Sequence, residues 1–332
     1  MVGAGQPGGK PHPRRAGGSL SLNDIVVALS GGIGGAKLAL GLSNALPAEE
    51  LLLVANTGDD FEHLGLHVSP DIDTLTYSLA GLDNQELGWG RRDESWAFME
   101  ALGALGGATW FRLGDRDLAT HVERTRRLRA GDSLSAITAD FARRLGVGPR
   151  ILPMSDDPVR TRVLTVQGWV DFQDWFVGQQ ARPAVRAVQF RGAAEARPQP
   201  ELLATLASGR VRAVVICPSN PLISVEPILA VPGVRDAIAG CGAPVVAVSP
   251  IIAGQAVKGP TATMLRDLGT EPSAAAVAQR YGALLQGYVM EPDDDASGIA
   301  ARVFRAPTLM RGLPDKIALA QVVLNAADRL RA

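Results

Sequence analysis

The sequence has few cysteines, no marked excess of charge of either sign and no long apolar run. Its 332 residues carry 33 Lys and Arg against 34 Asp and Glu, which excludes a polybasic nucleic-acid binder and a long disordered acidic chain. No apolar stretch approaches the roughly 20 residues of a membrane helix. Two cysteines, Cys217 and Cys241, cannot form a disulfide framework and lack zinc-site spacing. We therefore expect a cytoplasmic protein without nucleic-acid or membrane partners.

The first 23 residues are rich in Gly, Pro, Arg and Ser and almost free of apolar side chains. They lack the apolar core of a signal peptide. We interpret 1–23 as a weakly basic disordered tail. Residues 24–332 are then predicted to form a single α/β domain.

The start of this domain alternates between buried strands and a helix. A short apolar run at 25–29, a glycine-rich turn at 31–35, a helix at 36–46 and a second apolar run at 51–55 follow one another. Further buried strands are predicted at 213–217 and 245–248. This order is typical of a doubly wound, mostly parallel, Rossmann-like sheet in a three-layer α/β/α arrangement.

Two segments interrupt the α/β pattern. A helical insertion is predicted at about 71–145, and period-2 alternation predicts a β-hairpin at about 159–177. The helices expected in the insertion and in the second half of the chain are 73–79, 94–105, 118–128, 133–145, 201–207, 234–239, 273–285 and 316–330.

The glycine-rich turn, SGGIGGAK at 30–37, is the first candidate binding motif. Glycines between a strand and a helix let backbone N–H groups approach a phosphate. The run lacks the third glycine of the dinucleotide fingerprint, and Lys37 is followed by Leu38 rather than by Ser or Thr as in a P-loop. Phosphate binding and a purely structural tight turn both remain open.

Four carboxylates follow the second strand within a short stretch: Asp59, Asp60, Asp71 and Asp73. The carboxyl ends of parallel strands are where open α/β sheets bind ligands. Asp71 or Asp73 alone would serve as a helix N-cap. The group exceeds what capping needs, so it indicates a divalent-metal site or a site that orients a hydroxyl group.

A second polar motif, LGDRDLATH at 113–121, joins a loop to a helix. Asp117, His121 and Arg124 recur at helical spacing and share one face. Arg116 stands between two aspartates, which is compatible with an internal ion-pair network and equally with a guanidinium offered to a phosphate or carboxylate.

Polar groups also follow the strands predicted in the second half. Ser219 and Asn220 come after one strand, Ser249 after the next, and Lys258 and Gly259 shortly later. All should reach the same sheet edge as the glycine turn and Asp59. This convergence is a stronger indication of a site than any single motif.

Taken in order, these motifs resemble the 2-phospho-L-lactate transferase family of coenzyme F-420 biosynthesis. The stretches that carry the resemblance are SGGIGGAK (30–37), NTGDD (56–60), SPDIDT (69–74), LGDRDLATH (113–121), ILPMSDDPVRT (151–161), CPSNP (217–221) and AVSPIIAGQAVKGP (247–260). They span nearly the whole chain after the tail. Ile33 departs from the Thr of many relatives, which removes a hydroxyl group from the glycine turn.

The resemblance implies a Mg²⁺-dependent transferase, typically a homodimer. Such enzymes join 7,8-didemethyl-8-hydroxy-5-deazariboflavin to a phosphorylated three-carbon acid (2-phospholactate, phosphoenolpyruvate or 3-phosphoglycerate), which arrives on a guanosine diphosphate-type donor that releases GMP. The product is coenzyme F-420-0 or its dehydro form.

The resemblance also assigns roles to residues. Asp71, Asp73 and Arg116 would be catalytic, and the deazaflavin would contact Asp73, Arg116 and Asp59. The Mg²⁺ ligands would come from Asp59, Asp60, Asp71 and Asp73. The nucleotide and its phosphates would contact Gly31, Gly32, Gly34, Gly35, Lys37, Ser219, Asn220, Ser249, Lys258 and Gly259.

Two other functions compete with this interpretation. The related gluconeogenesis-factor branch shares the glycine turn and NTGDD and would make the chain a non-catalytic regulator that binds sugar nucleotides. The intact GDRDLATH and MSDDPVRT motifs weigh against it. A nicotinamide-dependent oxidoreductase is suggested only by the first β-turn-α unit, and Asn56 stands where that fold needs an acidic residue.

Overall fold

A computed structural model describes residues 25–85 and 89–332. The tail predicted at 1–23 lies outside the described residues. Within the described ranges, no helix combines the length and apolarity needed to cross a membrane.

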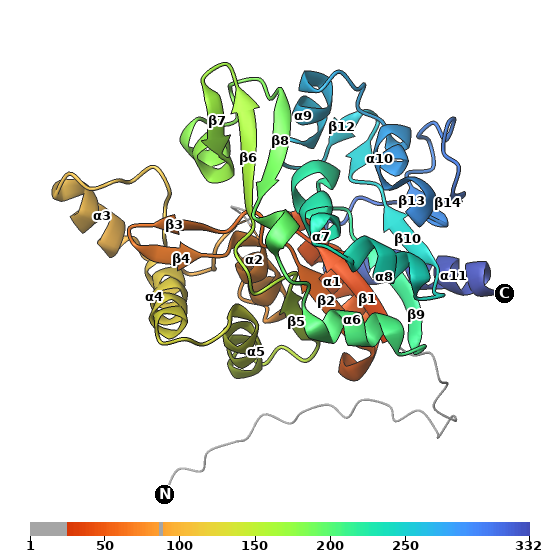
Figure 1. Ribbon diagram of the computed structural model, residues 1–332, viewed down its shortest axis with the longest axis horizontal. Coiled ribbons are helices and arrows are strands. Elements are labelled where there is room, and N and C mark those ends of the chain that lie inside the picture. The colour runs from red at the N-terminus through yellow and green to blue at the C-terminus, as the bar shows by residue number, and fades with distance from the viewer. Residues whose placement is uncertain (1–24, 86–88) are drawn as a thin grey trace, which may run out of the picture.

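A seven-stranded parallel sheet forms the centre of the molecule (Figure 1). Its strands, in spatial order, are β14 (Arg302–Arg305), β13 (Gly287–Met290), β10 (Val245–Val248), β9 (Val211–Ile216), β1 (Ile25–Ser30), β2 (Leu51–Ala55) and β5 (Arg150–Pro153). The chain builds outward from β1 through β2 to β5, then returns to the other side of β1 and builds outward through β9. The direction of winding therefore reverses between β1 and β9, which is where doubly wound sheets bind ligands.

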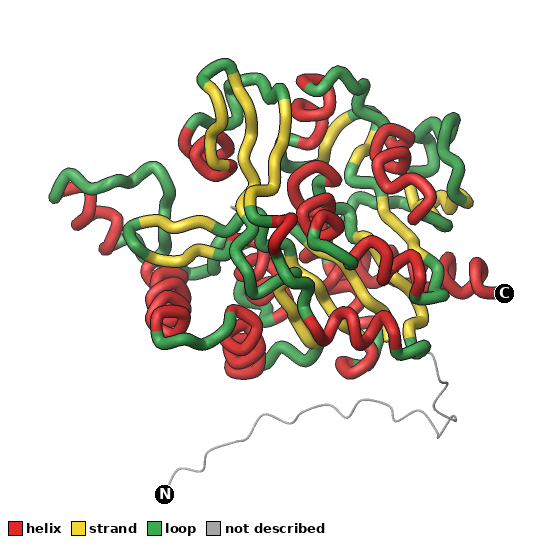
Figure 2. Tube along the Cα trace, in the orientation of Figure 1, coloured by secondary structure: helices red, strands yellow, loops and turns green. Residues whose placement is uncertain are grey.

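Helices cover both faces of this sheet, as the colouring in Figure 2 shows. In β1, Val26 and Ala28 pack into one apolar core, whereas Val27 and Leu29 pack into the other. The first core contains side chains of α1 (Gly32–Ala45) and α11 (Leu313–Arg331), and the second contains side chains of α6 (Pro200–Ala207), α8 (Val234–Gly240) and α10 (Ala274–Tyr281). Since successive strand residues point to opposite faces, continuous burial of β1 requires these two helical layers. The predicted three-layer α/β/α architecture is confirmed.

Nine of the eleven helices in the described part of the chain lie at predicted positions, with ends that differ by up to four residues, whereas α7 and α9 were not predicted. They are α1 (Gly32–Ala45), α2 (Pro70–Leu79), α3 (Ala97–Ala104), α4 (Asp115–Arg129), α5 (Leu134–Arg144), α6 (Pro200–Ala207), α7 (Glu226–Ala230), α8 (Val234–Gly240), α9 (Thr261–Asp267), α10 (Ala274–Tyr281) and α11 (Leu313–Arg331). Short 3₁₀ or π turns are η1 (Ala48–Glu50), η2 (Asp174–Gly178), η3 (Ala193–Glu195), η4 (Pro221–Val225) and η5 (Gly282–Leu284).

Three small sheets accompany the central sheet in the described part of the chain. The predicted hairpin is present as β6 (Arg160–Thr165) and β7 (Gly168–Asp171), and a third strand that the sequence analysis missed, β8 (Ala187–Arg191), pairs with β6. The helices of the predicted insertion, α2 to α5, follow a further unpredicted hairpin, β3 (Phe61–His63) and β4 (Leu66–Val68). A last short pair is β11 (Ile251–Ile252) and β12 (Gln255–Ala256). The assignment of 24–332 to one domain stays a prediction.

The glycine-rich segment differs from its prediction. It was expected to be a turn at 31–35, but α1 already begins at Gly32. Glycine is a poor helix former, so tertiary contacts must override its propensity here. A Cβ at Gly34 would lie 2.2 Å from the carbonyl oxygen of Pro218, and Gly32 has a φ of +64°. The glycines therefore allow the first turn of α1 to pack directly against the loop after β9.

A close approach between α1 and α11 also depends on a glycine. A Cβ at Gly41 would lie 2.1 Å from the carbonyl oxygen of Lys316 and 3.3 Å from Cβ of Ala320. We predict that Gly41→Ala lowers the free energy of unfolding by roughly 1–3 kcal/mol, because helix backbones must separate. Chemical denaturation measures this loss. Gly240→Ala is the matched control: no atom lies within 4 Å of its added Cβ, so equal losses in both variants would contradict the packing argument.

Candidate functional site

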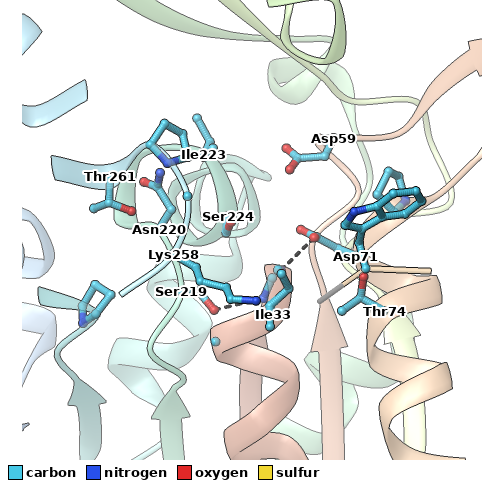
Figure 3. A pocket seen from close by; sticks show the side chains of 18 of the residues that line it. Ile33, Asp59, Asp71, Thr74, Ser219, Asn220, Ile223, Ser224, Lys258 and Thr261 are labelled. Atoms are coloured by element: carbon cyan, nitrogen blue, oxygen red, sulfur yellow. Dashed lines mark hydrogen bonds between the residues drawn. The ribbon is translucent and has the colours of Figure 1, made fainter. Parts of the chain in front are cut away.

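A cavity of about 560 Å³ opens at the carboxyl ends of β1, β2, β9 and β10. Figure 3 shows Asp59, Asp71 and Thr74 on one side of it, Ser219, Asn220 and Thr261 on the other, and the start of α1 with Ile33 between them. The convergence expected at this edge places the following predicted site residues in its lining: Gly31, Gly32, Gly34, Lys37, Asp59, Asp71, Ser219, Asn220, Ser249, Lys258 and Gly259.

The first turn of α1 forms the floor between the two sides. The Gly31 N–H donates to Oγ of Ser219 at 3.1 Å, and the Gly32 N–H donates to Oδ1 of Asp71 at 2.7 Å. Protein groups thus already use these two donors. The N–H groups of Ile33 and Gly34 lie in the same first turn, have no acceptor within the helix and belong to lining residues. With the positive end of the helix dipole, they can receive an anion.

Gly35 has a packing role and does not line the cavity. A Cβ at this position would lie 2.6 Å from the hydroxyl oxygens of both Ser219 and Ser30. Gly35 therefore allows α1 to pack against the ends of β1 and β9. Its role is to support the predicted phosphate site and not to line it.

Asp71 is held by hydrogen bonds from two separate parts of the fold. One carboxylate oxygen accepts the Gly32 N–H, and the other accepts Nδ2 of Asn56 at 2.8 Å. Asn56 in turn accepts the Gly58 N–H and donates to the carbonyl oxygen of Ile223. Burial raises the pKa of Asp71 to about 6, although the hydrogen bonds from Asn56 and Gly32 act in the opposite direction. Asp71 is thus a rigidly oriented carboxylate that faces the cavity.

Asp59 shares the acidic side of the cavity with Asp71. It is buried, and its Oδ1 has no hydrogen-bond partner among the described residues. Burial first, and then the nearby charge of Asp71, raise the pKa of Asp59 well above its usual range. Two buried carboxylates that both have a raised proton affinity, one with an unpartnered oxygen, fit a divalent cation, which would relieve the cost of burying their charges.

The four predicted metal carboxylates are not all brought together. Oδ2 of Asp60 accepts from Ser69 at 2.8 Å and lies 3.1 Å from Nε2 of His67, and Asp60 does not line the cavity. Asp73 also lies outside the lining. The structure therefore divides the set: Asp59 and Asp71 face the cavity, whereas Asp60 and Asp73 lie behind it.

Asp73 belongs to a buried network on α2 and α4. Both of its oxygens accept from the guanidinium of Arg124, and His121 Nδ1 lies 3.7 Å from Oδ2. Nε2 of the same His121 lies 3.3 Å from Asp117. Asp73, Asp117 and His121 can bring ligand atoms within 4.8 Å of one another, but Arg124 already neutralises Asp73. The geometry thus favours an ion-pair network that joins two helices over the predicted metal or hydroxyl role of Asp73.

Arg116 lies on the exposed side of α4, outside the cavity lining. The motif around it helps to cap two helices: Glu94 accepts the N–H groups of Arg116 and Asp117 at the start of α4, and Asp115 accepts those of Ala97 and Phe98 at the start of α3. The arginine that lines the cavity is instead Arg112, whose guanidinium lies 4.1 Å from the ring centre of Trp96. The catalytic and deazaflavin-binding roles assigned to Arg116 remain predictions without support from this geometry.

The cavity lining also has a basic part, which we call the positive wall. Lys37 and Lys258 both line the cavity there, and the Lys37 ammonium donates to the carbonyl oxygen of Met310 at 3.0 Å. Burial, followed by the positive charges of Lys258 and Lys316, lowers the pKa of Lys37. The cavity lining therefore contains both an acidic part, with Asp59 and Asp71, and a basic part, with Lys37 and Lys258.

One end of the cavity is aromatic. Phe172 and Phe176 stack with their ring centres 5.3 Å apart and their planes 10° from parallel. Trp110 and Phe111 come from the loop before α4 and complete this part of the lining with Trp89. A flat, partly polar ring system would find extensive contact there.

The sequence analysis missed several lining residues. They include Phe111, Arg112, Phe172, Gln173, Phe176, Thr261, Thr308, Leu309 and Met310. Phe172 and Phe176 gave a usable signal, because a spacing of four places both on one side of a helical turn. Met310 gave none, since only the fold brings it to the start of α1.

Comparison with known proteins identifies similar sequences over most of the chain. The family model described as "2-phospho-L-lactate transferase CofD" matches residues 26–297. A protein named phosphoenolpyruvate transferase from Streptomyces griseus is 42% identical over 320 residues, which cover 92% of this chain and 99% of that protein. A protein of the same name from Mycobacterium avium is 38% identical, and the matched region covers 96% of that protein.

A solved structure shares the fold at much lower identity. The UPF0052 family protein bh3568 from Bacillus halodurans superposes with a TM-score of 0.61 at 14% sequence identity, over 91% of this chain and 99% of that one. At this identity the likeness supports the architecture of the sheet and its helices. It does not choose between catalysis and ligand binding.

Proposed function

The chain belongs to the CofD family of 2-phospho-L-lactate transferases, and on that premise we propose that it moves a phosphorylated three-carbon acid from a guanosine diphosphate-type donor to the ribityl hydroxyl group of 7,8-didemethyl-8-hydroxy-5-deazariboflavin. It is a transferase by family. For the acid, we propose phosphoenolpyruvate, which would give the dehydro form of coenzyme F-420-0. The names of the relatives at 37–43% identity support this choice.

The observation that carries the proposal is the division of one cavity into acidic, basic and aromatic parts. A donor with a diphosphate group needs cationic and N–H contacts, a divalent ion needs carboxylates, and a deazaflavin needs a flat apolar surface. Residues of all three kinds line the same cavity. Neither an oxidoreductase function nor a nucleophilic side chain for hydrolysis is needed to explain these three parts of the cavity.

The proposed reaction is a displacement at phosphorus. The ribityl hydroxyl oxygen forms a bond to the phosphorus that bears the acid, and the bond from that phosphorus to the oxygen of GMP breaks. GMP leaves with the electron pair, and the hydroxyl proton passes to a carboxylate on the acidic side of the cavity. Such a reaction requires alignment and neutralisation of charge more than covalent participation by the protein.

The residues of the acidic side fit the Mg²⁺ that the family implies. Asp59, with its unpartnered Oδ1, and Asp71, held by Asn56 and Gly32, would hold the ion. When bound, Mg²⁺ would neutralise the diphosphate and polarise its oxygens. Asp71 is hydrogen-bonded to the start of α1, where the phosphates would lie. The carboxylates would therefore hold the ion next to the phosphates.

The positive wall would hold the diphosphate of the donor. The first-turn N–H groups of Ile33 and Gly34 and the ammonium groups of Lys37 and Lys258 all belong to lining residues. Ser219 and Asn220 line the adjoining wall. The aromatic end would then take the deazaflavin ring, and its ribityl chain would extend from the ring toward the diphosphate of the donor.

A product assay tests this proposal. The purified protein is incubated with the deazaflavin precursor and each of three guanylylated acids, with Mg²⁺ or with a chelator, and products are identified by mass. We expect one Mg²⁺-dependent product from the phosphoenolpyruvate donor. Absence of product from every donor, with the precursor and GDP both bound, would favour the nucleotide-binding regulator instead.

A further inference from the structure

The segment Thr308–Met310, which we call the strap, lies outside the residues that the family model matches. It connects β14 with α11 and contributes all three of its residues to the cavity lining. Thr308 and Met310 are buried, whereas Leu309 is 37% exposed. A segment without regular secondary structure thus forms part of the wall on which Lys37 lies.

One carboxylate fixes the first half of the strap. Oε1 of Glu291 accepts the Thr308 N–H at 2.6 Å, the Thr308 hydroxyl at 2.8 Å and the Leu309 N–H at 3.1 Å. Glu291 directly follows β13 and is not itself a lining residue. Three donors on one charged oxygen are a strong, directional anchor.

The other half of the strap is anchored by α11 and contacts Lys37. Oδ2 of Asp315 accepts the N–H groups of Arg311 and Gly312 just beyond the strap. Between the two anchors, the carbonyl oxygen of Met310 accepts from the Lys37 ammonium at 3.0 Å. This bond uses one of the three ammonium donors and leaves two for a ligand in the cavity.

We infer that Glu291 is a positioning residue for the donor: it holds the strap so that the Met310 carbonyl group aims the Lys37 ammonium at the donor's phosphates. The inference rests on the proposed function, because it assumes that the basic wall receives a diphosphate. Glu291 touches no ligand in this account. Its effect therefore passes entirely through Lys37.

A double-mutant cycle tests this route. We would measure the Kd for GDP by calorimetry, and kcat and KM for both substrates, in Glu291→Ala, Lys37→Ala and the double variant. Glu291→Ala should raise the Kd for GDP and the donor KM about tenfold, as expected for loss of a charge-assisted anchor. The KM for the deazaflavin should not change. In the Lys37→Ala background, the loss of Glu291 should add nothing.

Two further variants complete the test. Glu291→Gln keeps an acceptor without the charge and should raise the Kd about threefold, so it also serves if Glu291→Ala does not fold. Asp293→Ala changes an exposed carboxylate two residues away and should leave binding as in the wild type. Additive effects of Glu291→Ala and Lys37→Ala, or an unchanged Kd in both Glu291 variants, would overturn the inference while wild-type turnover stands. A wild-type protein that neither binds GDP nor turns over would overturn the proposed function itself.

Discussion

Replacement of Asp59 by Asn is expected to reduce turnover at least about 100-fold while the protein remains folded. The substitution keeps the shape of the side chain and removes one negative charge from the acidic wall. Because Oδ1 of Asp59 has no hydrogen-bond partner among the described residues, the fold loses no contact there. Steady-state kinetics measure the loss, and Mg²⁺ titration by calorimetry should show weakened binding in parallel.

Glu62→Gln provides the control for this prediction. Glu62 is an exposed acid on β3 and does not line the cavity, so the same loss of charge should leave both turnover and Mg²⁺ binding unchanged. Wild-type Mg²⁺ affinity in Asp59→Asn would exclude Asp59 as a ligand. Asp71→Asn is less informative, since it also disturbs the bonds to Gly32 and Asn56.

Replacement of Arg124 by Met is expected to lower the free energy of unfolding by roughly 3–5 kcal/mol. Arg124 is 1% exposed and binds both oxygens of Asp73. Methionine fills much of the volume but leaves the buried Asp73 carboxylate without its counter-charge. Denaturant titration at neutral pH measures the loss.

The double variant Arg124→Met/Asp73→Asn separates this structural role from a metal-binding one. Removal of the stranded charge should restore about half or more of the lost stability, since the cost lies in the unpaired ion. Its turnover should stay within about tenfold of the wild type if Asp73 only joins α2 to α4. Complete inactivity of a well-folded double variant would contradict this purely structural role and support the predicted catalytic role of Asp73.

The division between Asp71 and Asp73 follows from helix geometry. Both residues lie on α2, two positions apart, and such residues point in nearly opposite directions because each position turns the helix by about 100°. If Asp71 faces the cavity, Asp73 must face away, toward α4. The motif SPDIDT contains both residues but does not indicate which one faces the ligand. The predicted shared face of His121 and Arg124 is confirmed, since both lie against Asp73.

Much of the fold and of the site edge was accessible from sequence. The buried run at 51–55 predicted β2 at its observed bounds, and the rule on carboxyl ends brought Ser219, Ser249 and Asp59 to one cavity. The position of Arg116 was not accessible, because the side of α4 that faces solvent depends on how α4 packs against β4 and α5. The strap was not accessible either: its partner Lys37 is 273 positions away from Met310.

The pH dependence of Mg²⁺ binding follows from the raised pKa values of Asp59 and Asp71. Without metal, both carboxyl groups hold protons more tightly in the folded chain than in the unfolded chain. Their contribution to stability is therefore fully present at low pH and is lost as the pH rises through about 6, where Asp71 titrates. Mg²⁺ binds the deprotonated pair, so it should restore stability only on the alkaline side.

The most direct test of a cation site between Asp59 and Asp71 is the change in Tm caused by Mg²⁺ at two pH values. At about pH 7.5, saturating Mg²⁺ should raise the Tm of the wild type by several degrees, and at about pH 5 the shift should nearly vanish. Asp59→Asn should show little shift at either pH. A Mg²⁺-induced shift of equal size at both pH values, or one retained in Asp59→Asn, would contradict the account.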